Sequence, residues 1–352
     1  MRVFHKFSTE HEDLVHDVSY DFYGKRLATC SSDQKIKVWD LSDTGKWELS
    51  AEWKAHSGSV WKVAWAHPEY GQVLASCSFD RTVCIWEECE DDKGQKKWVL
   101  KAPLVDSRDS VVDIKFSPKA FGLRLATCSL DGYVRIYEAM DIMNLSQWTI
   151  VEDFESQKGS SSNCISWNPN PYDKPMIAVG SNDSFIKIWE YNEGQRKWVQ
   201  VDTHLPSLSY TGSGSSGQGQ SSIINNNNNN NNNNSLKRGL SNLDDQSEEQ
   251  NRMIHDIAWA PNMGRSYHLI AIASKDNTVR IWKLSNHQDR TKLELKEIMN
   301  KNDHKSEVWR VEWNITGTIL ASSGDDGNVC LWKCNMNGEW KLLTKVSNNN
   351  NE

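Results

Sequence analysis

The sequence lacks the features that mark membrane proteins and nucleic-acid-binding proteins. It contains no apolar run of about 18 residues or more, so we expect no transmembrane helix. Residues 1–6 lack the apolar segment of a secretory signal, so we expect the protein in the cytosol and nucleus. Lys and Arg number 40 against 47 Asp and Glu, and the formal net charge of -7 argues against direct binding to DNA or RNA.

Motifs of catalysis and cofactor binding are also missing. The sequence has no P-loop, GxGxxG, GxSxG or HExxH string. Its 8 cysteines include no CxxC pair, and Cys330 with Cys334 is a weak pair for zinc. We therefore predict neither an enzyme nor a bound cofactor or metal ion.

Tryptophan is in excess, with 17 residues, and an internal repeat explains it. In six places a polar turn carries an Asp that is followed six residues later by an aromatic side chain. An apolar run precedes each Asp and an alternating run such as KIKVW follows it, which is typical of two strands joined by a tight turn. The pairs are Asp33/Trp39, Asp80/Trp86, Asp131/Tyr137, Asp183/Trp189, Asp276/Trp282 and Asp326/Trp332.

Each repeat has two further strands. One precedes the pair, as in WKVAW, and the other follows it, opening at Trp47, Trp98, Trp148, Trp198, Leu293 and Trp340. Four short strands in a period of 47 to 52 residues, apart from one long interval, are typical of WD-type propeller blades. The sequence therefore predicts an all-β, six-bladed propeller over residues 1–346, with blades ending near Asp40, Trp86, Tyr137, Trp189, Trp282 and Trp332, each plus an outer strand.

The long interval contains an insertion. Residues 206–250, between blades four and five, are rich in Ser, Gly and Asn and include ten consecutive Asn residues, 225–234. Such a composition cannot bury enough apolar surface to offset the entropy of ordering, so we expect a disordered loop. We expect the same of the tail, residues 347–352.

The repeat Asp is predicted to hold each blade together. Its carboxylate can accept hydrogen bonds from the main-chain N–H groups of its own turn and from an imidazole in the incoming loop. His11, His56 and His304 stand at that incoming position, whereas the other repeats have Ser107, Lys158 and Gln250. Since no second ligand lies at metal-binding spacing, we interpret these histidines as structural.

One predicted strand is in excess of the four that each of the six repeats needs. Residues Val3 to Phe7 read as a strand, although the last repeat already has a fourth strand at its C-terminal end. Either one terminus frays, or the N-terminal strand begins a seventh blade with open edges that a partner completes by adding strands. For the second case we predict an interface at Val3, Phe4, Phe7, Lys37, Val38, Val329 and Leu331.

Several segments resemble the Sec-thirteen/Seh family of WD-repeat propellers. They include HDVSYDFYGKRLATCSSDQKIKVWD, HSGSVWKVAWAHPEYGQVLASCSFDRTVCIWEE and VEWNITGTILASSGDDGNVCLWK. The stretch from VRIYEA to MNLSQW, together with WNITGT, resembles the Seh, nucleoporin branch. The resemblance covers nearly the whole chain outside the Asn-rich insertion and the tail.

The resemblance implies a structural function. Family members form an open six-bladed propeller whose seventh blade comes in trans from an α-solenoid nucleoporin. It implies membership of the Y-shaped outer-ring complex of the nuclear pore at the nuclear envelope, with other Y-complex nucleoporins as partners. It also implies a place in the SEA/GATOR complex at the lysosome or vacuole surface, where a Mio-type subunit would donate the blade in amino-acid signalling to TOR.

Two other functions remain open. A coat-vesicle scaffold of the Sec-thirteen type shares the blade-two string, and a peptide-binding WD-repeat adaptor would use the mouth of the channel instead of the gap. An enzyme is the most remote alternative, since no motif brings titratable groups together.

Overall fold

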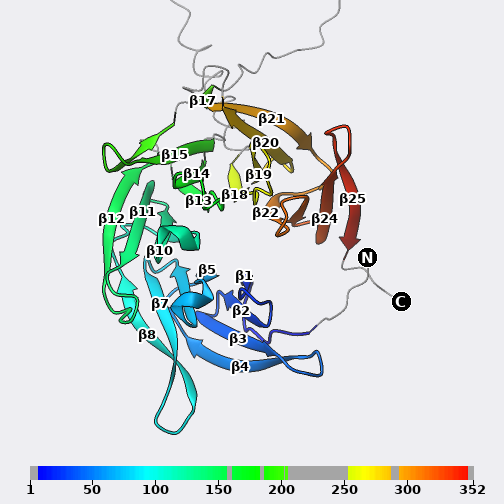
Figure 1. Ribbon diagram of the computed structural model, residues 1–352. Coiled ribbons are helices and arrows are strands. Elements are labelled where there is room, and N and C mark those ends of the chain that lie inside the picture. Colours follow the sequence, from blue (N-terminus) through cyan, green and yellow to red (C-terminus); the bar gives the residue numbers. More distant parts are fainter. Residues whose placement is uncertain are drawn as a thin grey trace, which may run out of the picture.

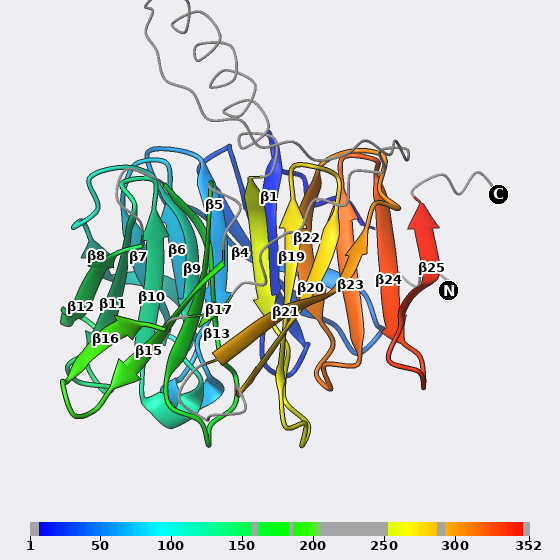
Figure 2. The same ribbon diagram turned by 90° about the horizontal axis from the view of Figure 1, so that it is seen from above.

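The computed structural model describes residues 7–156, 161–182, 186–201, 203–204, 253–286 and 293–347. Their strands form six sheets arranged as the blades of a ring (Figure 1). The strands run between the two faces of the ring (Figure 2). This arrangement confirms the predicted six-bladed all-β fold. Several sequence predictions lie outside the described residues: the insertion 206–250, residues 348–352 of the tail, Val3, Phe4, Lys158, Asp183 and Gln250.

The first three blades have four strands each. Blade one consists of β1 (Val15–Tyr20), β2 (Arg26–Ser31), β3 (Lys35–Leu41) and β4 (Trp47–Lys54). Blade two consists of β5 (Val60–Trp65), β6 (Val73–Ser78), β7 (Val83–Glu90) and β8 (Lys96–Leu104). Blade three consists of β9 (Val111–Phe116), β10 (Arg124–Ser129), β11 (Tyr133–Ala139) and β12 (Trp148–Glu155). Short 3-10 turns, Pro68–Tyr70 and Lys119–Phe121, follow β5 and β9.

The other three blades repeat the pattern. Blade four consists of β13 (Ser162–Trp167), β14 (Met176–Ser181), β15 (Ile186–Asn192) and β16 (Lys197–Gln200). Blade five consists of β18 (Ile254–Trp259), β19 (His268–Ser274), β20 (Val279–Asn286) and β21 (Leu293–Lys301), with β17 (Thr203–His204) paired parallel to β21. Blade six consists of β22 (Val308–Trp313), β23 (Ile319–Gly324), β24 (Asn328–Cys334) and β25 (Trp340–Ser347). Ser347, which we assigned to the tail, therefore belongs to β25.

The tight turn after each repeat Asp requires a left-handed residue. The position after the Asp has a positive φ in all five of these turns that the structure describes, although it is a glycine in two of them. The residues are Gln34, Arg81, Gly132, Asn277 and Gly327. The strain of a left-handed non-glycine residue is offset by the hydrogen bonds that the neighbouring Asp makes in the same turn.

The hydrophobic core lies between the blades. Ile36 and Val38 of blade one, for example, pack with Val63 and Trp86 of blade two in one buried cluster. Strand alternation produces this arrangement, because successive side chains point to opposite faces of a sheet and each face meets a neighbouring blade. A blade without a neighbour must therefore expose apolar side chains.

The C-terminal strand completes blade six. β25 pairs antiparallel with β24 along its whole length, from Cys334 opposite Trp340 to Asn328 opposite Ser347. The sequence left open which terminus fills this place. The ring is consequently open between β25 and blade one, as Figure 1 shows.

Candidate partner-binding site

The repeat Asp and the incoming His form one hydrogen-bonded chain with the blade tryptophan. In blade two, His56 Nδ1 lies 3.2 Å from Asp80 Oδ2 and its Nε2 lies 2.7 Å from Ser76 Oγ. Trp86 Nε1 donates to the same Ser76 oxygen at 3.0 Å. The imidazole is buried, so its two nitrogens and the serine hydroxyl satisfy one another inside the blade.

Blades one and six contain the same chain. His11 links Asp33, at 2.7 Å, to Thr29, at 2.9 Å, and Trp39 donates to Thr29 Oγ1 at 3.2 Å. In blade six, the corresponding residues are His304, Asp326, Ser322 and Trp332.

Arginine replaces histidine in blades three and five. Arg135 Nη2 donates to Asp131 at 2.7 Å, and Arg280 pairs with Asp276 in the same way. Both arginines stand four residues after the Asp, and we did not identify them from the sequence. The signal was present, because this position is a cysteine in blades two and six, where the small side chain leaves space for the histidine.

The repeat aromatic residues of blades three, four and five make other contacts. Tyr137 donates through its hydroxyl to Asp106 at 3.0 Å. Trp189 stacks on Phe154 of blade three with ring centroids 4.1 Å apart. Trp282 packs against the core cluster between blades four and five.

Burial and hydrogen bonding shift the pKa values of the ionisable groups in these networks. Burial raises the pKa of Asp80, but hydrogen bonds from His56, Thr82 and Ser57 outweigh it, and the net pKa is lowered. Burial raises the pKa of the Cys84 thiol to about 11, which leaves it a poor nucleophile. Within the described parts of the chain, no group of three or more His, Cys, Asp or Glu side chains could hold a metal ion, and no helix is long and apolar enough to span a membrane.

Blade six has an open face on the side away from blade five. Val329 exposes 39% of its surface there, and Leu331 on the same face is partly exposed. Residues at the Val329 position of the other blades are at most 5% exposed, and those at the Leu331 position at most 1%. They are Ile36, Val83, Val134, Ile186 and Val279 for the first position, and Val38, Ile85, Ile136, Ile188 and Ile281 for the second.

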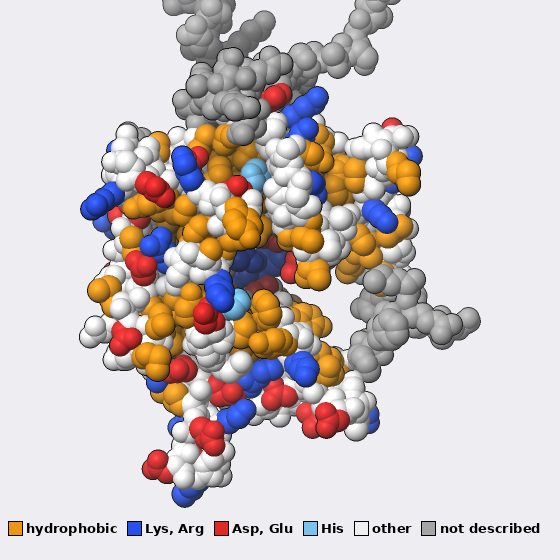
Figure 3. All heavy atoms as spheres, viewed as in Figure 1, with side chains coloured by type: hydrophobic (Ala, Val, Ile, Leu, Met, Phe, Trp, Pro, Cys, Tyr) orange, Lys and Arg blue, Asp and Glu red, His pale blue; other side chains and the backbone are white. Residues whose placement is uncertain are grey.

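Blade one has the complementary open face. Val18 exposes 51% of its surface and Tyr20 exposes 57%. Residues equivalent to Val18 in the other five blades are at most 4% exposed, because the preceding blade covers them. These residues are Val63, Ile114, Ile165, Ile257 and Val311. The space-filling view shows hydrophobic side chains on both sides of the opening between blades one and six (Figure 3).

The first described residues cover part of the open face of blade one. Phe7 lies 5.1 Å from the ring of Trp39 and 6.5 Å from that of Trp47, between ring centroids. Lys37 Nζ donates to the main-chain oxygen of Glu10 at 2.8 Å. The segment therefore shields the outer part of this face and leaves Val18 and Tyr20, nearer the channel, uncovered.

Part of our interface prediction was wrong. Lys37 and Val38 lie on β3, which pairs with β2 on one side and β4 on the other, so they are not on a sheet edge. Val38 faces blade two and is fully buried, and the Lys37 side chain is covered by the chain near Glu10. Period-two alternation should have separated the two residues, since neighbours on a strand face opposite blades.

Val329 and Leu331 also lie on an inner strand, β24, and not on an edge. They nevertheless line the open face of blade six, because that face has no neighbour.

Known proteins resemble the chain along its whole length. Nucleoporin SEH1-A of Xenopus laevis is 47% identical over 100% of this chain and 90% of its own length. The chain belongs to the SEH1 family of nucleoporins. Nucleoporin SEH1 of Homo sapiens is 47% identical over 99% of this chain and 89% of its own length. Nucleoporin SEH1 of Danio rerio is 47% identical over 97% of this chain and 86% of its own length.

The repeats themselves match the WD domain, G-beta repeat family. The matched residues are 2–40, 47–87, 149–190, 246–283 and 295–333. These matches omit the third blade, where Tyr137 replaces the repeat tryptophan and Arg135 replaces the histidine. The WD-repeat matches agree with the propeller fold that the tryptophan pattern predicted.

Proposed function

We propose that this SEH1-family chain is a non-enzymatic scaffold subunit of the Y-shaped outer-ring complex of the nuclear pore. In this role it receives a blade from an α-solenoid nucleoporin in the gap between blades six and one. The observation that carries the proposal is the pair of unmatched apolar faces, Val329 and Leu331 on one side and Val18 and Tyr20 on the other. The names of the relatives support the nuclear pore as the place of action.

A blade is the occupant that the two faces fit best. At every other junction, an apolar face of one sheet packs against the face of the next, with residues spaced two apart on each strand. The same spacing recurs on the open faces, so a sheet in the gap would bury Val329, Leu331 and Val18 together. Main-chain pairing with the predicted strand from Val3 to Phe7 would add hydrogen bonds.

The physical role of such a complex is to make a solenoid end rigid. A blade held between two packed faces loses its freedom to bend, and the propeller then fixes the direction of the solenoid in the larger assembly. No reacting group is needed for this function. The scaffold role supports pore assembly and, through it, transport of protein and mRNA.

The same gap would serve the second assembly that the family resemblance implies. A Mio-type solenoid of the SEA/GATOR complex would present its blade to the same two faces, so the two partners would exclude each other from one propeller. This arrangement would bring the protein to the lysosome or vacuole surface without a membrane-spanning segment of its own.

Open-face variants test the proposal. Val329→Glu combined with Val18→Glu should abolish co-purification of the α-solenoid nucleoporin while the propeller stays folded, because a blade in the gap would bury both charges. The matched control is Tyr172→Glu, on a loop away from the gap, where the tyrosine is 94% exposed. Recovery of the solenoid with the open-face variant as with wild type would contradict the proposal.

The same purification distinguishes the two alternatives. Recovery of vesicle-coat subunits in place of pore subunits would indicate a coat scaffold of the Sec-thirteen type. Binding that survives changes in the gap and fails on changes at the channel mouth would indicate a peptide-binding adaptor.

A further inference from the structure

One repeat position forms a ring of charged side chains at the centre of the propeller. It lies three residues before the end of the innermost strand of each blade, and five of its six members are charged. In blade order the residues are Asp17, Lys62, Asp113, Cys164, Asp256 and Arg310. These strands surround a central cavity of about 1360 Å³.

The three aspartates join the blades in pairs. Asp17 Oδ2 of blade one accepts the main-chain N–H of Val63 in blade two at 3.2 Å. Asp113 accepts that of Ile165 in blade four at 2.9 Å, and Asp256 accepts that of Val311 in blade six at 3.1 Å. Charge-assisted hydrogen bonds therefore link blades one to two, three to four and five to six.

Tryptophans reinforce the same pairs. Trp65 Nε1 donates to the main-chain oxygen of Ser19 in blade one, Trp167 to that of Lys115 in blade three, and Trp313 to that of Ala258 in blade five, each at 3.0 Å. Each aspartate carboxylate and each indole thus spans one junction within a pair.

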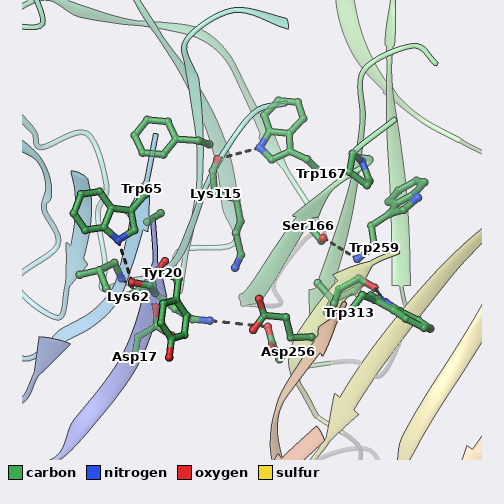
Figure 4. A pocket seen from close by; sticks show the side chains of 18 of the residues that line it. Asp17, Tyr20, Lys62, Trp65, Lys115, Ser166, Trp167, Asp256, Trp259 and Trp313 are labelled. Atoms are coloured by element: carbon green, nitrogen blue, oxygen red, sulfur yellow. Dashed lines mark hydrogen bonds and ion pairs between the residues drawn. The ribbon is translucent and has the colours of Figure 1, made fainter. Parts of the chain in front are cut away.

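Lys62 of blade two contacts a carboxylate of the neighbouring blade three and one of blade five, across the channel. Its Nζ lies 3.7 Å from Asp113 Oδ1 and 4.0 Å from Asp256 Oδ1, and Figure 4 shows the side chain extended toward Asp256. Burial and the charge of Arg310 lower the pKa of Lys62, but the carboxylates of Asp113, Asp256 and Asp17 raise it by more. The lysine therefore stays charged and balances the carboxylates of the ring.

Arg310 occupies the junction where no blade follows. Its Nη2 donates to the main-chain oxygen of His16 in blade one at 3.0 Å and lies 3.8 Å from Asp17 Oδ1. Asp17 therefore accepts a hydrogen bond from blade two through Oδ2, and its Oδ1 lies near Arg310 of blade six. In the described part of the chain, the polar contacts from blade six to blade one all come from Arg310.

The innermost strands elsewhere pack directly on each other. β1 contacts β5, and the series continues through β9, β13 and β18 to β22. From β22 back to β1 this packing is replaced by the guanidinium contact. We propose that Arg310 is a clasp that holds the open ring together at its gap and sets the separation of the two open faces.

The proposal is tested on the free protein, so it does not depend on the proposed function. Nitroxide labels on Glu48→Cys in β4 and Lys341→Cys in β25 would report the distance across the gap by double electron–electron resonance. The background carries Cys89→Ser and Cys334→Ser, because the other six cysteines are buried. We expect Arg310→Met to shift this distance distribution to longer values and to broaden it.

Two controls make the outcome specific. A label pair at Glu48→Cys and Lys97→Cys spans blades one and two, and its distribution should not change with Arg310→Met. Lys62→Met removes the other cation of the ring, and it should leave the distance across the gap unchanged.

An unchanged distribution across the gap in folded Arg310→Met would overturn the proposal, and so would an equal shift in Lys62→Met. If Arg310→Met does not fold, Arg310→Lys keeps the charge but shortens the reach to His16. It should shift the distribution in the same direction, and an unchanged distribution in that variant would overturn the clasp.

Discussion

Val329 in blade six and Val279 in blade five hold the same position in their blades, yet Val329 exposes 39% of its surface and Val279 exposes 1%. The difference lies in the neighbours, because β20 packs against blade six and β24 faces the open gap. Apolar side chains that repeat a buried pattern on an uncovered face form the surface on which we propose that the partner blade packs.

The two valines should respond differently to truncation. We expect Val279→Ala to lower the free energy of unfolding by about 1–3 kcal/mol, since it removes buried methyl groups and leaves a cavity. Val329→Ala should cost about 0.5 kcal/mol or less in the free protein. Chemical denaturation of both variants measures the difference, and equal losses would mean that the face of blade six is already covered.

The buried histidine chain should contribute strongly to stability. His304 is 1% exposed and contacts both Asp326 and Ser322. We expect His304→Ala to cost about 1–3 kcal/mol, because it removes two hydrogen bonds in the blade interior and leaves a cavity where the imidazole was. His67→Ala, at a partly exposed histidine, is the matched control, with an expected cost of about 0.5 kcal/mol or less. A similar loss in both variants would contradict the structural role of His304.

An ion pair joins blades one and two. Arg26 donates to both carboxylate oxygens of Glu88 in blade two, at 2.8 and 2.9 Å, and to Asp40 at 2.7 Å. We expect Arg26→Ala to cost about 1–3 kcal/mol, since two-point pairs with little solvent exposure are the strong ones.

Arg124 offers a matched control in blade three. It stands at the same repeat position as Arg26 but pairs with Glu138 of its own blade, and both side chains are at least a quarter exposed. Arg124→Ala should cost about 1 kcal/mol at most. Thermal unfolding compares the two variants, and an equal loss would show that the link between blades adds nothing.

Acid should destabilise the propeller in a defined range. Burial raises the pKa of Asp131, but hydrogen bonds from Arg135, Ser129 and the main-chain N–H groups of Arg108 and Tyr133 lower it from 3.8 to about 2. Because the folded pKa lies below the unfolded one, this stabilisation is present above about pH 4 and is lost as the pH falls toward 2.

Asp131→Asn tests the assignment. The variant should be less stable than wild type at neutral pH, and its stability should fall less steeply between pH 4 and 2. Denaturation midpoints measured across this range give the two slopes. Identical slopes would show that another group carries the acid sensitivity.

The sequence predicted the blades well, because the information is local. An Asp, a left-handed turn residue and an aromatic six positions later fix a hairpin by turn chemistry and strand alternation alone, as at Asp80 and Trp86. The strand count that left Val3 to Phe7 unassigned raised the possibility of an open ring, but the sequence did not decide which terminus completes blade six; the pairing of β25 with β24 does.

The missed features depend on distances between blades. Arg310 and Asp17 are 293 positions apart, and nothing local links a guanidinium at one end of the chain to a carboxylate at the other. The error at Val38 was different in kind. Alternation along the strand assigns its side chain to the face toward blade two, and we treated the whole strand as one surface.

Arg135 was missed for another reason, although it pairs within its own blade. We looked for a replacement of the histidine only in the incoming loop.

Photo-crosslinking tests the central claim most directly. A benzoylphenylalanine at position 329, on the open face, is compared with one at position 172, on an exposed loop, in cells that also express the solenoid partner. A covalent product between the chain and the α-solenoid nucleoporin from position 329, and none from position 172, is the result we predict. A product from position 172 with none from position 329 would contradict a blade inserted in the gap.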